Sequence, residues 1–179
     1  KIVFYGPALS GKTTNVCQAY EVLPEDDRGE LRRLETQDER TLYFDYAPIT
    51  RGEIAGFVTK FKLFSVPGQV FYKETRRIVL QGVDGVVFVA DSDPERTQAN
   101  IDALMDLEDN LRAHGLELSR IPLVIQFNKR DLPDVRSVQA MNTDLNPMGV
   151  PIIEAVATDN TGVMETLEAV TGIVSVRIR

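Results

Sequence analysis

The sequence predicts a doubly wound α/β fold, in which about five helices cover both faces of a mixed, mostly parallel sheet of six strands. Two observations lead to this prediction. Short apolar runs rich in β-branched residues recur along the chain, and stretches of helical periodicity separate them. Several of these runs are apolar throughout, and such strands are typical of parallel sheets with helices on both faces.

The character of each run predicts its place in the sheet. Residues 86–90 are apolar throughout, which favours a central strand. Residues 57–66 alternate, with Phe61 on one side and Lys60 and Lys62 on the other, as expected near an edge where an antiparallel strand pairs beside them. The expected strands are 1–5, 41–46, 57–66, 83–91, 121–127 and 150–156, and the expected helices are 13–23, 72–81, 95–114, 134–145 and 161–174.

Length and composition indicate one ordinary globular unit. The chain has 179 residues and a mass of 20.0 kDa, and 43% of the residues are hydrophobic while 26% are charged. A formal net charge of -7 gives no basic footprint, so we expect no nucleic-acid partner. Cys17 is the single cysteine of the sequence and can form no internal disulfide, which fits a cytoplasmic location. No apolar run approaches the roughly 20 residues of a membrane span, so no integral membrane segment is expected.

A phosphate-binding pattern, G-x-x-x-x-G-K-[ST], lies between the first predicted strand and the first predicted helix. Gly6 and Gly11 permit a tight backbone that directs amide hydrogens at phosphate oxygens, and the helix adds the positive end of its dipole. Lys12 is expected to contact the β- and γ-phosphates, and Thr13 to ligate Mg²⁺. A glycine-rich turn that binds nothing is the alternative, and the position between strand and helix argues against it. The predicted phosphate-binding residues are Gly6, Ala8, Leu9, Ser10, Gly11, Lys12, Thr13 and Thr14.

A second motif, Asn128-Lys129-Arg130-Asp131, directly follows a predicted strand. Because parallel strands end at the same edge of a sheet, this motif should lie beside the phosphate loop. Asp131 can accept two hydrogen bonds from the N1–H and the exocyclic amine of guanine, a pattern that adenine does not offer. Asn128 and Lys129 would support the loop and the base. A charged turn is the better interpretation of this motif alone, and the phosphate motif upstream reverses that preference.

Residues 24–40 form the longest segment without a strand or helix pattern, so a loop is expected there. Its composition is that of a solvated surface connection. Its position after the helix of the phosphate motif favours a segment that moves with the bound nucleotide.

These motifs resemble those of the Ras-like small GTPases, and within them the bacterial MglA group of cell-polarity GTPases. The resemblance covers almost the whole length and includes Glu39-Arg40-Thr41, Ser65-Val66-Pro67-Gly68-Gln69 and Glu154-Ala155-Val156-Ala157. It implies a P-loop NTPase fold with residues 1–179 as a single Ras-like G domain. It also implies GTP or GDP and Mg²⁺ as ligands, and GTP hydrolysis that is slow without an activating protein.

The resemblance also implies roles for single residues. Thr41 would close on Mg²⁺ and the γ-phosphate, Gly68 would sense the γ-phosphate, and Gln69 would orient the attacking water. The backbone amide of Ala157, beside Val156, would contact guanine O6.

Arg40 is similar to an arginine that the MglA group supplies in cis where the γ-phosphoryl group departs. Without the family, an exposed loop charge would be the better interpretation of this residue. An arginine in the catalytic role contributes roughly 10³- to 10⁵-fold to the rate in studied GTPases. Its loss should therefore spare binding and suppress turnover.

Two positions depart from the usual Ras-like pattern. Ser65 stands where most Ras-like proteins carry an aspartate near Mg²⁺, and Asp45 on the neighbouring predicted strand is expected to reach the metal through water. Ala8 stands where the family usually carries glycine, and its methyl group crowds the space that Gln69 and the arginine must enter. Hydrolysis is therefore expected to be slow while binding stays tight.

The function expected from the sequence is a GTP-dependent switch that recruits effectors. By resemblance to the MglA group, its output would be cell polarity or motility, its activator a roadblock-type protein like MglB, and its location a pole or membrane face to which partners recruit it. A hydrolysis-poor, GTP-bound scaffold is the alternative, which Ser65 and Ala8 support. An ATP-using phosphotransferase is a third hypothesis, against which Asp131 argues.

Overall fold

A single mixed sheet organises the molecule in the computed structural model, which describes residues 1–34, 44–54, 57–69 and 72–178. Among these residues, seven strands lie in the order β2-β3-β4-β1-β5-β6-β7. β3 pairs antiparallel with both β2 and β4, and the other pairs are parallel. The strands are β1 (Ile2–Tyr5), β2 (Arg32–Leu34), β3 (Phe44–Ile54), β4 (Phe57–Ser65), β5 (Gly85–Asp91), β6 (Leu123–Asn128) and β7 (Ile152–Glu154).

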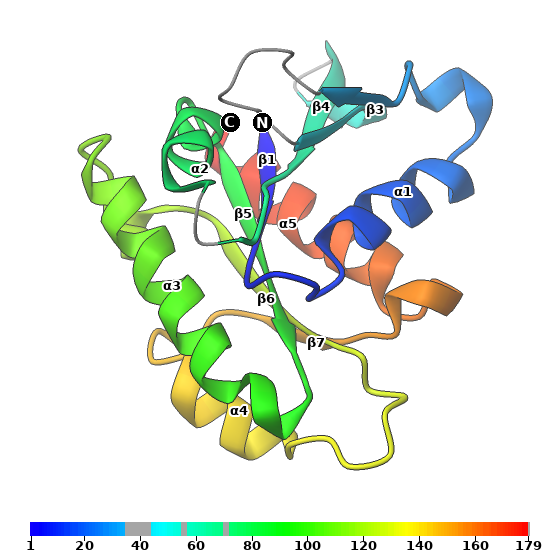
Figure 1. Cartoon of the computed structure of the whole chain (residues 1–179). Coiled ribbons are helices and arrows are strands. Elements are labelled where there is room, and N and C mark those ends of the chain that lie inside the picture. Colours follow the sequence, from blue (N-terminus) through cyan, green and yellow to red (C-terminus); the bar gives the residue numbers. More distant parts are fainter. Residues whose placement is uncertain (35–43, 55–56, 70–71, 179) are drawn as a thin grey trace.

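Helices cover the sheet on both faces, as predicted (Figure 1). α1 and α5 lie on one face, and α2, α3 and α4 lie on the other. The described α-helices are α1 (Lys12–Val22), α2 (Lys73–Leu80), α3 (Thr97–Arg112), α4 (Val138–Leu145) and α5 (Val163–Ile178). The doubly wound α/β fold class is thereby confirmed.

The two helix layers explain why the central strands are apolar throughout. In β1, Ile2 and Phe4 pack into the core beneath α1 and α5, whereas Val3 and Tyr5 pack into the core beneath α2, α3 and α4. All residues of β1, β5 and β6 are buried. Since each fully buried large side chain contributes about 1.5–3 kcal/mol, these strands anchor both layers at once. The alternation predicted along β4 is also present, because Phe61 is buried while the side chains of Lys60 and Lys62 are exposed.

Residues 24–34, the described part of the expected loop 24–40, contain more regular structure than the sequence predicts. A short 3₁₀ turn at Glu25–Asp27 is followed by β2, which pairs Arg32 with Tyr46 across the antiparallel ladder with β3. This strand adds a seventh to the six expected and moves β3 away from the sheet edge. Backbone pairing at an edge needs no apolar pattern, so the polar residues of β2 gave no strand signal.

The ends of the helices follow local caps. α4 begins at Val138 instead of residue 134, because Ser137 accepts a hydrogen bond from the Ala140 amide (3.2 Å) and so fixes the start. α3 is preceded by a 3₁₀ turn that Asp93 caps by accepting from the Glu95 amide (2.9 Å). Within the described ranges, none of the helices has both the length and the apolar character needed to cross a membrane.

Candidate functional site

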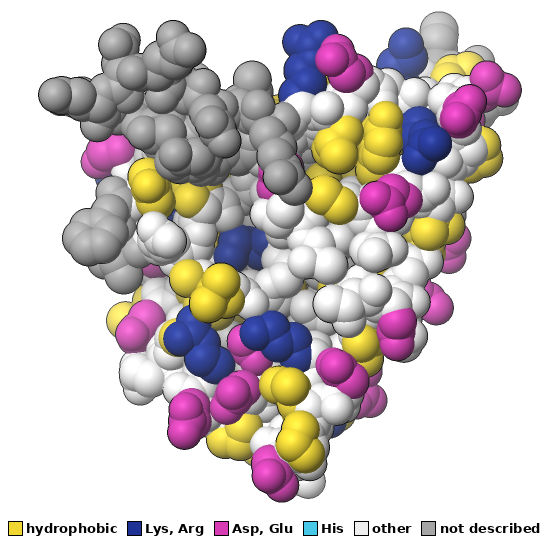
Figure 2. All heavy atoms as spheres, turned by 45° about the vertical axis from the view of Figure 1, so that its right-hand side comes forward, with side chains coloured by type: hydrophobic (Ala, Val, Ile, Leu, Met, Phe, Trp, Pro, Cys, Tyr) yellow, Lys and Arg dark blue, Asp and Glu magenta, His cyan; other side chains and the backbone are white. Residues whose placement is uncertain are grey.

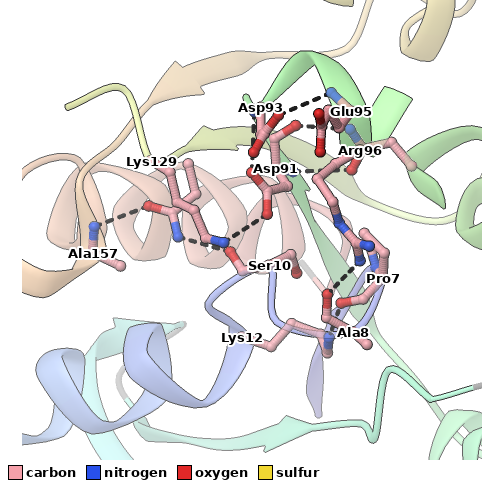
Figure 3. Close-up of polar contacts among 12 residues, drawn as sticks. Pro7, Ala8, Ser10, Lys12, Asp91, Asp93, Glu95, Arg96, Lys129 and Ala157 are labelled. Atoms are coloured by element: carbon pink, nitrogen blue, oxygen red, sulfur yellow. Dashed lines mark hydrogen bonds and ion pairs between the residues drawn. The ribbon is translucent and has the colours of Figure 1, made fainter. Parts of the chain in front are cut away.

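The predicted phosphate and base motifs meet at one edge of the sheet. β1, β5 and β6 run parallel and end at Tyr5, Asp91 and Asn128, and β7 ends beside them at Glu154. Open α/β sheets bind ligands at the carboxyl ends of their strands. Figure 3 shows residues of the phosphate loop, β5 and the base motif gathered at this edge.

Two glycines of the phosphate loop stand where no side chain fits. Gly6 has φ 145°, and a Cβ there would lie 2.2 Å from the carbonyl oxygen of Val89. Gly11 has φ 99°, and a Cβ there would lie 2.2 Å from Nδ2 of Asn128. The loop therefore packs directly on β5 and on the base motif. Leu9 also has a positive φ of 66°, and its side chain is 84% exposed.

The start of α1 is suited to an anion. Gly11 precedes the helix and offers no side-chain cap, so amides of the first turn are left for an external acceptor. Lys12 is buried, and its Nζ donates to the Pro7 carbonyl (2.5 Å). Burial, and then the nearby charges of Arg76 and Arg96, lower the pKa of Lys12 to about 7. A phosphate group would stabilise this cation, so the residues present fit a nucleoside polyphosphate.

Asn128 connects the phosphate loop to the loop after β7. Its Nδ2 donates to the Ser10 carbonyl (2.8 Å), and its Oδ1 accepts from the Ala157 amide (2.9 Å). The amide of Val156 donates to the Thr161 carbonyl (3.0 Å). Both amides are thus engaged within the chain, and a contact of Ala157 with guanine O6 stays a prediction.

The base motif lines its own pocket. A cavity of about 200 Å³ is bounded by Leu9, Thr14, Lys129, Asp131 and Ala157, among other residues. Asp131 is exposed to this space, as a base-recognising carboxylate requires.

Asp91, a residue that sequence reasoning missed, holds Lys129 in place. The Asp91 side chain is 1% exposed, its Oδ2 accepts from Lys129 Nζ (2.7 Å), and its Oδ1 accepts from the Asp93 amide (3.1 Å). The sequence does contain a signal for this role, because Asp91 is a carboxylate at the end of an otherwise apolar strand. A buried charge at such a position requires a partner of opposite charge.

Three oxygen-bearing side chains adjoin the start of α1. Ser65 Oγ lies 3.4 Å from Thr13 Oγ1 and donates to Asp45 Oδ2 (2.7 Å). The backbone pairing of Asp45 with Ser65 across β3 and β4 sets this arrangement. Hydroxyl and carboxylate oxygens are the ligands that Mg²⁺ prefers, so this donor set fits the metal expected there. Ser65 lies between Asp45 and Thr13, so an indirect contact of Asp45 with the metal, through water, stays a prediction.

The predicted switch residues lie partly within the described chain. Gly68 packs on the phosphate loop so closely that a Cβ would lie 2.5 Å from both the amide nitrogen and the Cα of Ala8. Gln69 is exposed and lines a cavity of about 590 Å³ together with Lys12 and Thr13. Arg40 and Thr41 lie outside the described residues.

Arg96 is a second site residue that the sequence did not reveal. It lies in the turn before α3, and its Nη2 donates to the Ala8 carbonyl (2.8 Å; Figure 3). Lys12 and Arg96 thus place positive charge at the phosphate loop, although the chain as a whole has a net charge of -7. On the face shown in Figure 2, basic side chains of the described residues lie among acidic ones.

Comparison with known proteins agrees with this geometry. The model of the ADP-ribosylation factor family (Arf) matches residues 31–173. The mutual gliding-motility protein MglA of Myxococcus xanthus (strain DK1622) is 49% identical over 179 residues, which are 100% of this chain and 92% of that protein. The second match includes the phosphate loop, which precedes the region matched by the family model. The chain therefore belongs to the ADP-ribosylation factor family and is an MglA-like small GTPase, a GTP-hydrolysing switch of the Ras-like superfamily.

Proposed function

We propose that residues 1–179 act as one G domain that binds GTP or GDP with Mg²⁺ at the site above and recruits effectors in the GTP-bound state. The phosphate loop, with Lys12 and the amides at the start of α1, would hold the β- and γ-phosphates. Asp131 would select guanine, and Lys129, held by Asp91, would support the base.

In this proposal Thr13 and Thr41 hold Mg²⁺, and Asp45 acts through water. When bound, the metal would neutralise charge on the β- and γ-phosphate oxygens. Ser65 keeps the Asp45 carboxylate beside Thr13 through the hydrogen bond described above.

The observation that carries the proposal is the contact of Gly68 with the backbone of Ala8. Anything that enters the space beside Ala8 must alter the position of Gly68, and therefore of Gln69. A γ-phosphate bound beside this loop would thus directly change the position of residues 67–69. Gln69 would then orient the attacking water, and Arg40 would stabilise the departing phosphoryl group.

The similarity to MglA supports an output in cell polarity or motility. By the same resemblance, the activating partner would be a roadblock-type protein like MglB, and partners would recruit the chain to a pole or membrane face. The protein itself would remain cytoplasmic.

A hydrolysis-poor scaffold is the second candidate, favoured by the same contact. The Ala8 methyl adds volume where Gly68 already approaches the loop, and both residues line the cavity of about 560 Å³ between the loop and α3. A scaffold of this kind would recruit effectors while GTP stays intact.

Single-turnover hydrolysis of GTP that has been pre-loaded on the protein in the presence of Mg²⁺ separates the two candidates. For the switch, we expect measurable turnover that rises in Ala8→Gly and collapses in Arg40→Ala and Gln69→Leu without loss of nucleotide affinity. GTP that persists for hours in the parent and all three variants, even with an activating protein present, would instead establish the scaffold. Failure to bind guanine nucleotides at all would reject both candidates.

A further inference from the structure

Arg76 on α2 contacts the segment that carries Gln69. Its side chain is 7% exposed, and its Nη1 donates to the Gln69 carbonyl (2.5 Å), with the Pro67 carbonyl 3.4 Å away. The two carbonyls lie on either side of Gly68, the residue that packs on Ala8. One guanidinium therefore contacts the backbone both before and after the point where this segment meets the phosphate loop.

A largely buried polar network also binds the guanidinium of Arg76. Arg76 Nε donates to Asp106 Oδ2 of α3 (2.7 Å). The same carboxylate oxygen accepts from the hydroxyl of Tyr5 and from Asn110 Nδ2 (3.1 Å), and Asn110 Nδ2 also lies 3.0 Å from the Tyr5 hydroxyl. Tyr5 ends β1, directly before Gly6. The network thus connects the base of the phosphate loop, α3 and the Gln69 segment.

The chemistry of the network favours a fixed geometry. Burial and the hydrogen bond to Asp106 raise the pKa of Tyr5, so its hydroxyl stays a donor. A planar guanidinium presents several N–H donors in a rigid fork, so one edge can bind a carboxylate while another binds main-chain carbonyls. A lysine could keep the charge near Asp106, but its single ammonium group cannot reproduce both contacts.

We propose that Arg76 is a positioning residue for GTP hydrolysis, which sets the backbone orientation of Gln69 and thereby the direction of its side chain. Arg76 touches neither nucleotide nor water in this role, and it acts through Gln69. The inference rests on the proposed function of Gln69. Because catalytic rates fall about 100-fold when a group is displaced by about 1 Å, a modest turn of this backbone should be visible in the rate.

The test compares single-turnover hydrolysis of pre-loaded GTP in Arg76→Lys, Gln69→Leu and the double variant. Arg112→Lys is the matched control, because Arg112 pairs with Glu108 on the exposed side of α3. We expect Arg76→Lys to hydrolyse GTP roughly 10- to 100-fold more slowly, with GDP affinity within about threefold of the parent and no change in Arg112→Lys. The double variant should be no slower than Gln69→Leu, since residues that act as a unit are not additive.

Three outcomes would overturn the inference. Equal rates in Arg76→Lys and Arg112→Lys, with Gln69→Leu slow, would leave the role of Gln69 intact and remove that of Arg76. Losses that multiply in the double variant would show a general structural role. If Gln69→Leu hydrolyses GTP like the parent, the proposed role of Gln69 falls, and this inference falls with it.

A second measurement keeps the test decisive if Arg76→Lys is unstable or turnover is very slow. Tyr5→Phe removes one donor to Asp106 and leaves Arg76 in place. We expect faster hydrogen exchange in the peptide that contains residues 67–69 of the GDP-bound Tyr5→Phe protein, and no change in Arg112→Lys. Identical exchange in Tyr5→Phe and the parent would reject the network as the support of this segment.

Discussion

Lys12 donates a hydrogen bond to the carbonyl of Pro7, 2.5 Å away, so its ammonium group lies against the backbone of its own phosphate loop. Among the residues that the structure describes, the buried ammonium has this carbonyl as its acceptor and forms no ion pair. Nucleotide phosphates would supply that charge, so the protonation of Lys12 and nucleotide binding should be linked.

The first prediction concerns this linkage. Burial lowers the pKa of Lys12 to about 7, and bound phosphates would raise it. Binding therefore takes up a proton above pH 7, so GDP affinity should be highest below pH 7 and fall by up to about tenfold per pH unit above it. Calorimetry in buffers of different ionisation enthalpy measures this uptake. In Lys12→Met the uptake should vanish, and its persistence there would assign the proton to another group.

Asn128→Ala should weaken GDP binding by about 10- to 100-fold. The substitution strands the Ser10 carbonyl and the Ala157 amide, and each buried unpaired group costs about 1–3 kcal/mol. Titration with a fluorescent GDP analogue measures the dissociation constant. Asn142→Ala on α4 is the control. An equal loss of GDP affinity in that variant would mean that the effect comes from reduced stability of the fold and not from the contacts of Asn128.

Asp91→Asn should lower affinity for guanine nucleotides by roughly tenfold, since the ion pair with Lys129 is replaced by a weaker bond to a neutral amide oxygen. The carboxylate of the neighbouring Asp93 caps a 3₁₀ turn instead, so Asp93→Asn should leave affinity unchanged. The ratio of GDP to inorganic pyrophosphate affinity separates base from phosphate effects. A loss shared equally by both ligands would contradict the role of Asp91 in supporting the base.

Asp45→Asn should raise the Mg²⁺ concentration needed to slow GDP release by about tenfold, since the carboxylate beside Ser65 and Thr13 loses its charge. Stopped-flow release at a series of Mg²⁺ concentrations measures this midpoint. Asp144→Asn, at an ion pair on α4, is the control. Unchanged Mg²⁺ dependence would remove Asp45 from the metal site.

Gly68→Ala should impair hydrolysis by pushing the segment at 67–69 away from the phosphate loop, because its Cβ would lie 2.5 Å from Ala8 backbone atoms. Gly172→Ala in α5 has open space around the new methyl group and should instead stabilise the protein by about 0.5–1 kcal/mol. Single-turnover hydrolysis and thermal unfolding, each measured on both variants, test these two expectations. Unaltered hydrolysis in Gly68→Ala would contradict the close packing as a requirement for turnover.

The fold was predictable because its signals are local. The apolar strands β1, β5 and β6 face a helix layer on each side, and that arrangement leaves a continuous run in the sequence. The short strand β2 was not predictable, since its pairing with β3 depends on backbone bonds across an edge.

The site divides in the same way. The phosphate loop and the base motif are contiguous patterns, so the sequence could indicate both. Arg96 and Arg76 donate to the main-chain carbonyls of Ala8 and Gln69. Because every residue type has such a carbonyl, the sequence at the contacted position gives no signal of the bond. The packing of α2 and α3 decides which arginines point toward the site, and no local sequence pattern indicates it.

The close approach of Gly11 to Asn128 limits which substitutions either position can accept. A Cβ at position 11 would clash with the Asn128 side chain, 2.2 Å from its Nδ2, and a shorter side chain at position 128 would lose the hydrogen bonds to both Ser10 and Ala157. Aspartate lacks the donor, and glutamine is one methylene too long. Substitutions at the two positions therefore depend on each other, and we expect a chimera that takes the phosphate loop from one relative and the base motif from another to keep the site intact only if both parents carry this pair.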